Sequence, residues 1–161
     1  HYNPANKTVN LSPEVYGGRS VSAAAVAAHE VGHAVQHATG YKWLEMRSQL
    51  VPVAQLSGKI MNIVLWSMIL GMSILKIFDM NTVIWVLIAA QAVITVVSVV
   101  TLPVEYDASN RALIWLTTSG TVTTSEHDKA KDALTWAART YLVAALASLT
   151  QLAYYFSLLR D

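Results

Sequence analysis

Two histidines and a glutamate are spaced so that they could hold a metal ion and activate water. In the stretch VAAHEVGHAV (26–35), His29 and His33 are four residues apart, so on a helix their side chains lie one above the other. Two imidazoles in this position can bind one zinc ion. Glu30 lies about 100° around the helix from His29, where its carboxylate could take a proton from water. The motif therefore predicts metal-dependent hydrolysis, with Glu30 as the base.

A hydrolytic zinc site needs a third protein ligand. The chain has no cysteine, which excludes a thiolate. His37 would lie two turns from His29, about 12 Å along the helix axis, too far to bind the same ion. The longer motif His-Glu-x-x-His-x-x-Gly-x-x-His, which supplies a third histidine ligand, is also excluded. This chain has Gln36 in place of the glycine and Thr39 in place of the third histidine.

Glu105 is the strongest candidate for the third ligand. It closely follows Pro103, which is expected to begin a helix over 103–116. The residues three, four and seven positions after Glu105 are small and would allow close contact with the metal helix: Ala108, Ser109 and Ala112. His1 and His127 remain alternatives, although neither lies in a recognisable ligand motif.

The residues after Glu105 could orient the ligands. Asp107, Ser109 or Asn110 could accept the second ring N–H of a ligand histidine, and the sequence does not choose among them. Asp107 and Arg111 are four residues apart, so they could instead form a surface ion pair. A donor that stabilises the oxyanion is also expected, and the sequence offers three candidates: His127, Arg111 and Tyr106.

The composition indicates a mostly α-helical membrane protein. Of the 161 residues, 54% are hydrophobic and only 13% are charged, which is unusual for a soluble domain. Proteins that bind nucleic acid usually carry a basic patch or stripe. The formal net charge of +1 gives no reason to expect one here, so nucleic-acid binding is not expected. The expected partners are the lipid bilayer and a peptide or protein substrate, which could itself be membrane-associated. No feature predicts a particular substrate, regulatory partner or oligomeric state.

The N-terminal part is expected to contain the metal helix and a short lead-in. Residues 7–12 alternate between polar and apolar and predict a lone strand between two proline-containing breakers. A helix is predicted over 20–39, with a serine N-cap and with Gly40 as its stop signal. Residues 41–51 mix aromatic, charged and apolar side chains before Pro52, which is typical of a membrane interface.

Two apolar runs, 60–78 and 83–100, each approach the roughly 20 residues that a helix needs to cross a bilayer. They predict an antiparallel hairpin that returns Glu105 to the side of the metal helix. After a loop at 117–125, a final helix is expected near Ser125, with Asp128 completing a capping box. The chain is thus predicted to be one domain, with a strand and metal helix (1–59), a transmembrane hairpin (60–102), the third-ligand helix and the helix after it (103–140), and a third span (141–159).

The positive charges predict the orientation in the membrane, because Lys and Arg near span ends are retained on the cytoplasmic side. Only Lys76 and Arg160 would lie on the opposite side from the metal helix. The other nine of the eleven lie on the same side as that helix: Lys7, Arg19, Lys42, Arg47, Lys59, Arg111, Lys129, Lys131 and Arg139. The site is therefore expected to face the cytoplasm.

Several segments resemble the bacterial YugP-type neutral zinc metallopeptidases, a family of small membrane proteins. The resemblance extends over essentially the whole chain, including HYNP, LSPEVYGGRS, AAHEVGHAVQH and LPVEYDASNRA. It implies zinc ligands at His29, His33 and Glu105, Glu30 as the base, and a further span before His1. The layout is also similar to that of the HtpX-like membrane peptidases, which place Asp four residues after the ligand Glu. Ser109 occupies that position here, so the orienting role could belong to Asp107.

The sequence therefore predicts an endopeptidase of the bacterial cell membrane with one zinc ion per chain in a small gluzincin-like site. An extended substrate could pair with the strand at 7–12. One alternative is an intramembrane protease, but the metal helix lies between Arg19 and Lys42 and is poor in Leu, Ile and Phe. The other alternative is a non-catalytic, zinc-dependent membrane scaffold.

Overall fold

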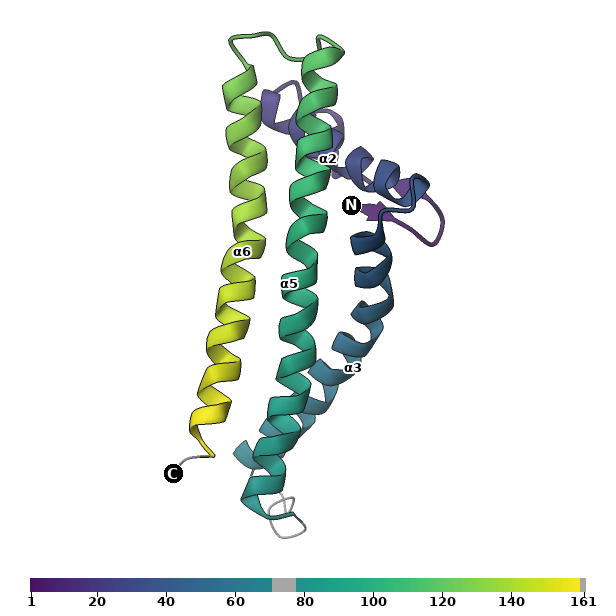
Figure 1. The fold of residues 1–161 in the computed structure, drawn as a ribbon. Helices are drawn as coiled ribbons and strands as arrows, with labels where there is room; N and C mark the ends of the chain where they lie inside the picture. Colours follow the sequence, from purple (N-terminus) through teal and green to yellow (C-terminus); the bar gives the residue numbers. More distant parts are fainter. Residues whose placement is uncertain (71–77, 160–161) are drawn as a thin grey trace. The chain divides into compact units, whose positions relative to one another are not determined.

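The computed structural model describes residues 1–70 and 78–159, and it confirms a mostly α-helical protein (Figure 1). Its elements are β1 (Tyr2–Asn3), β2 (Thr8–Val9), α1 (Pro13–Tyr16), α2 (Val21–Ala38), α3 (Lys42–Ile69), α5 (Met80–Thr118) and α6 (His127–Ser157). The chain divides into two compact units. Unit 1 comprises His1–Glu45 and Thr101–Leu142, and unit 2 comprises Met46–Val100 and Val143–Asp161.

The lead-in to the metal helix is a small hairpin followed by one helical turn. β1 pairs with β2 in antiparallel register, with Tyr2 opposite Val9. Lys7 closes the turn in the left-handed region, with φ of 56°. The prediction of a lone strand over 7–12 is therefore wrong, since the strand is paired and ends at Val9. It ends there because Ser12 is the N-cap of α1, with a proline in the first turn of the helix.

Helix α2 begins and ends as predicted. The Ser20 hydroxyl accepts the backbone N–H of Ala23 at 3.1 Å, which satisfies one of the free donors at the helix start. Gly40, with φ of 63°, follows the C-cap Thr39 in the left-handed conformation that ends many helices. The next helix, α3, begins at Lys42 and continues through Pro52.

Helix α5 is continuous from Met80 to Thr118 and contains Pro103 in its interior (Figure 1). The prediction that Pro103 begins a separate helix is therefore wrong. An interior proline removes one backbone hydrogen bond, and the other bonds of this 39-residue helix carry it past that point. Glu105 thus lies in the interior of a long helix, with helical backbone on both sides.

Within the described part of the chain, α5 is the helix that is long and apolar enough to cross a membrane. The predicted first span, 60–78, includes residues 71–77, which lie outside the described residues. Lys76 and Arg160, the two positive charges predicted on the far side, also lie outside them. The first span, and the third span within α6, stay predictions.

The last helix, α6, begins at His127 after a capping box that differs from the predicted one. The Thr123 N–H and the Thr123 hydroxyl both donate to the Glu126 carboxylate, at 3.0 Å and 2.7 Å. These hydrogen bonds lower the pKa of the Glu126 carboxyl. The predicted box of Ser125 and Asp128 is wrong, because the longer Glu side chain of Thr-x-x-Glu reaches back to the N-cap N–H.

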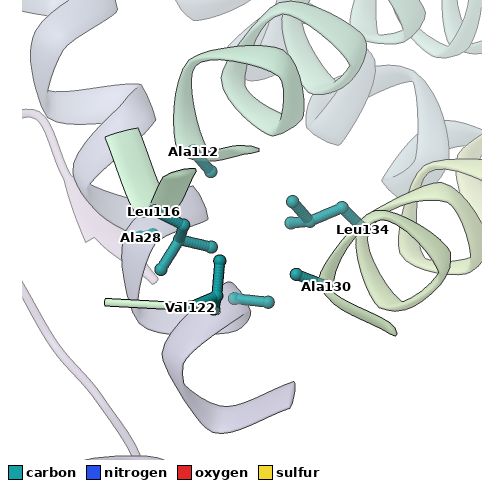
Figure 2. Packing of buried hydrophobic residues seen from close by; sticks show 7 residues of the cluster. Ala28, Ala112, Leu116, Val122, Ala130 and Leu134 are labelled. Atoms are coloured by element: carbon teal, nitrogen blue, oxygen red, sulfur yellow. The ribbon is translucent and has the colours of Figure 1, made fainter. Parts of the chain in front are cut away.

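Alanines and larger aliphatic residues together form the hydrophobic core of unit 1. Figure 2 shows side chains from α2, α5, α6 and the loop before α6 pointing toward one another: Ala28, Ala112, Leu116, Val122, Ala130 and Leu134. Three of these six are alanines, whose short side chains allow neighbouring helices to approach closely. The core therefore holds α2 against the part of α5 that carries Glu105.

Unit 2 combines an apolar cluster with a buried polar contact. The cluster contains Val64, Val83, Ile84, Leu87, Ile88 and Tyr155. The Gln91 amide donates to the Ser148 hydroxyl at 2.9 Å, and the Thr95 hydroxyl lies 2.8 Å from the same atom. Side-chain hydrogen bonds of this kind hold apolar helices together in a membrane.

Candidate metal centre

The ligand atoms of three residues converge in unit 1. His29 and His33 from α2 and Glu105 from α5 each offer one atom, and these atoms all lie within 4.8 Å of one another. Glu105 Oε2 is 3.1 Å from His29 Nε2 and 3.5 Å from His33 Nε2. A tetrahedral zinc ion with bonds of about 2.1 Å needs ligand atoms about 3.4 Å apart. The three residues therefore fit a zinc ion with little movement.

The three side chains are largely buried. The Glu105 side chain is 1% exposed, and those of His29 and His33 are 12% and 10% exposed. Burial lowers the pKa of His33, but the hydrogen bond and charge of Glu105, with help from Gln36, outweigh this and raise the pKa overall. Zinc binds a neutral imidazole, so this shift in the pKa of His33 opposes metal binding.

A hydrogen-bond partner orients the second nitrogen of each histidine ring. His29 Nδ1 lies 3.1 Å from the Ser109 hydroxyl, and His33 Nδ1 lies 2.9 Å from Gln36 Oε1. The two ring centroids are 4.7 Å apart, with an interplanar angle of 83°. With each Nδ1 engaged in this way, both Nε2 atoms face the Glu105 carboxylate.

The three candidates for orienting the ligands have different positions. Ser109 contacts a ligand imidazole directly. Asp107 instead accepts the Gln36 amide at 2.8 Å and Arg111 Nε at 2.6 Å, so it connects to the ligands through Gln36. Asn110 is exposed. Sequence reasoning missed Gln36, although its spacing of three residues from His33 places it on the metal face of α2.

The three candidate oxyanion donors differ in their exposure and in their contacts. Tyr106 is exposed, and Arg111 pairs with Asp107. The His127 ring lies 3.4 Å from the Asp128 carboxylate. Their role in stabilising an oxyanion stays a prediction.

Glu30 lies beside the ligands and contacts the N-terminal hairpin. Its Oε2 accepts the backbone N–H of Tyr2 at 2.8 Å, and its side chain is 18% exposed. His37 contacts the same residue, since its Nδ1 lies 2.6 Å from the Tyr2 hydroxyl. His37 is thus hydrogen-bonded to a residue of the hairpin. Among the described residues, His37 does not belong to the group whose ligand atoms converge.

The two helices that carry the ligands touch at Gly32. A Cβ added at Gly32 would lie 2.7 Å from the Ala108 carbonyl oxygen and 3.2 Å from its Cα. Because the Ala108 atoms belong to the backbone of α5, a side chain at Gly32 could be accommodated only if α2 and α5 moved apart. Gly32, between the two histidines, therefore sets the distance from α2 to Glu105.

Gly32→Ala is expected to lower the melting temperature and to remove most of the bound zinc, because the added methyl group forces α2 away from α5. Gly58→Ala is a matched control, since a Cβ there meets nothing within 4 Å. It should leave the zinc content unchanged and stabilise α3 by up to about 1 kcal/mol. Thermal unfolding and elemental analysis measure both effects. Wild-type stability and zinc content in Gly32→Ala would contradict this account of the helix contact.

Two histidines of a His-Glu-x-x-His helix and a glutamate from a second helix are the ligand set of several single-zinc hydrolases. The family model described as "Putative neutral zinc metallopeptidase" matches residues 1–160, and the chain belongs to this family. The resemblance found in the sequence is thereby confirmed.

The comparisons also identify a relative among curated proteins. The chain is 38% identical over 153 residues to a protein of Bacillus subtilis (strain 168) described as "Putative membrane protease YugP". The match covers 94% of this chain and 64% of the relative, so the chain spans less than two thirds of that protein's length. No solved structure matches the chain.

Proposed function

We propose that this chain is a membrane-embedded zinc endopeptidase whose active site faces the cytoplasm. The observation that carries the proposal is the convergence of His29, His33 and Glu105, with their ligand atoms within 4.8 Å of one another. Glu30 follows the first ligand directly in the sequence, as the hydrolytic motif requires. Membership of the family supports zinc-dependent proteolysis, and the name of the relative supports a membrane location.

Each residue of the site has a defined task in this proposal. When bound, zinc would act as a Lewis acid that polarises the scissile carbonyl and acidifies a water molecule. His29, His33 and Glu105 would hold the ion. Glu30 takes a proton from the attacking water and later gives it to the leaving amine. The Tyr2 N–H fixes the direction of the Glu30 carboxylate.

We place the substrate along the β1–β2 hairpin. An extended peptide can pair with a strand through main-chain hydrogen bonds. A backbone amide of β1 already contacts Glu30, so a strand added beside the hairpin would lie close to the base.

Purified protein should hold about one zinc ion per chain, and His33→Ala should lose most of it, because two remaining protein ligands make a weak site. His37→Ala is the matched control, since it removes an imidazole of the same helix that hydrogen-bonds to Tyr2. Elemental analysis measures the metal. A chelator should abolish peptide hydrolysis, and added zinc should restore it. Equal zinc contents in His33→Ala and wild type would rule out the site.

Reporter fusions should place residues 30 and 110 in the cytoplasm and the segment 76–82 outside, because nine of the eleven Lys and Arg residues are predicted on the side of the metal helix. The chain has no cysteine, so single cysteines introduced near residue 30 can also be labelled without background. Labelling by a water-soluble reagent separates this proposal from an intramembrane protease. A cytoplasmic 76–82 segment would overturn the hairpin or its orientation.

A further inference from the structure

Gln36 is a fully buried polar side chain on the metal face of α2, with 0% of its surface exposed. A buried amide is stable only when its polar atoms are hydrogen-bonded. Both polar atoms of this amide have partners. Oε1 lies 2.9 Å from His33 Nδ1, and Nε2 lies 2.8 Å from both the Val104 carbonyl and the Asp107 carboxylate.

These partners allow only one orientation of the amide. The Val104 carbonyl has no proton to donate, and an ionised Asp107 carboxylate has none either. The NH2 group of Gln36 must therefore face these two oxygen atoms. The amide oxygen then faces His33, where it can only accept, so the hydrogen of this contact belongs to His33 Nδ1. In a neutral His33 ring, Nε2 is then the nitrogen with the lone pair, and it is the one that faces Glu105.

The same amide joins the two helices that carry the ligands. Val104 and Asp107 belong to α5 and lie on either side of Glu105 in the sequence. Arg111 holds Asp107 in turn, with Nε 2.6 Å from Oδ2. The orientation of His33 is thus tied through one side chain to the backbone that presents the third ligand.

We infer that Gln36 is a positioning residue of the metal centre: its amide oxygen holds the Nδ1–H of His33 so that Nε2 is presented to the metal, and its NH2 group ties α2 to α5 beside Glu105. The Ser109 hydroxyl, from α5, lies 3.1 Å from Nδ1 of the other histidine ligand, His29. The inference rests on the proposed zinc site, although it does not depend on peptide hydrolysis.

The first test is an NMR measurement on the zinc-loaded full chain in detergent, carrying Glu30→Gln so that hydrolysis plays no part. Long-range 1H–15N spectra report which ring nitrogen binds the metal. His33 should bind through Nε2 and show an Nδ1–H that exchanges slowly with water. Metal binding through His33 Nδ1 would overturn the inference without any variant of Gln36.

Two substitutions separate positioning from a merely structural role. Gln36→Leu and Gln36→Glu both remove the NH2 group that reaches α5, but only Gln36→Glu keeps an oxygen acceptor for His33. Gln36→Leu should therefore speed the exchange of the His33 Nδ1–H and weaken zinc binding about 10- to 100-fold. Gln36→Glu should keep the slowly exchanging Nδ1–H. Ser109→Ala is the control, since it should change the signals of His29 and leave those of His33 unchanged.

Identical His33 signals in the two Gln36 variants would overturn the positioning role. Should Gln36→Leu fail to fold, metal binding through His33 Nδ1 in the chain with an intact Gln36 would overturn the role by itself. The outcome for the proposed function is distinct. Wild-type protein that binds zinc through the predicted nitrogens and cleaves no peptide would contradict the proposed hydrolysis and leave the role of Gln36 supported.

Discussion

Glu30→Gln is expected to keep the full zinc content while peptide hydrolysis falls by at least about a thousandfold. The amide has nearly the same shape as the carboxylate, but it cannot accept a proton from water. Its NH2 group can turn away from the Tyr2 N–H, so the contact with β1 can persist through the amide oxygen. Elemental analysis and hydrolysis of a fluorogenic peptide measure the two quantities on the same preparation.

Glu14→Gln is a suitable control, because Glu14 is an exposed carboxylate in unit 1. It should retain wild-type activity. Activity within tenfold of wild type in Glu30→Gln would exclude Glu30 as the base. A zinc-dependent scaffold without catalysis predicts a different result, namely no hydrolysis by the wild-type protein.

Glu105→Gln is expected to weaken zinc binding more than any other single carboxylate change in the chain. The substitution replaces a charged ligand by a neutral amide at a position that is 1% exposed, and the two histidines then remain as the strong ligands. Glu105→Asp should lose only part of the affinity, because the shorter side chain keeps the charge and reduces the reach. Competition with a chelator of known affinity gives the zinc dissociation constants.

Asp107→Asn and Glu45→Gln are the matched controls for this change. Asp107 contacts Gln36 and is connected to the ligands only through it. Asp107→Asn should therefore weaken zinc binding no more than about 10- to 100-fold, as is typical when a hydrogen-bond partner of a ligand is lost. Glu45 is exposed, and its replacement should have no effect. Equal losses in Glu105→Gln and Asp107→Asn would contradict the assignment of Glu105 as the third ligand.

The metal helix could be predicted from the sequence because its signals are local. The four-residue spacing of His29 and His33, the Ser20 N-cap and the Gly40 stop all lie within 21 residues of one another. The histidine spacing follows the period of the helix. The two end signals satisfy or limit the unpaired backbone N–H and C=O groups at the helix ends. The prediction of Glu105 depends instead on the exclusion of other ligand types and on an expected hairpin that returns the chain to the metal helix.

Other features could not be predicted because they depend on contacts between distant segments. The pairing of β1 with β2 depends on two strands of two residues each, too short for a periodic signal. Pro103 has the sequence signature of a helix start, but the apolar helix around it continues past it. Gln36 is not a metal-ligand type, and its role becomes visible only when α5 brings Val104 and Asp107 to its amide.

The most direct test of the proposed metal centre is a crystal structure of the zinc-loaded protein, with the ion located by its anomalous scattering at the zinc edge. One zinc ion should be bound by His29 Nε2, His33 Nε2 and a Glu105 oxygen, with each bond about 2.0–2.2 Å long. A Glu105 carboxylate more than about 4 Å from the ion, well beyond any zinc–oxygen bond, would contradict this assignment.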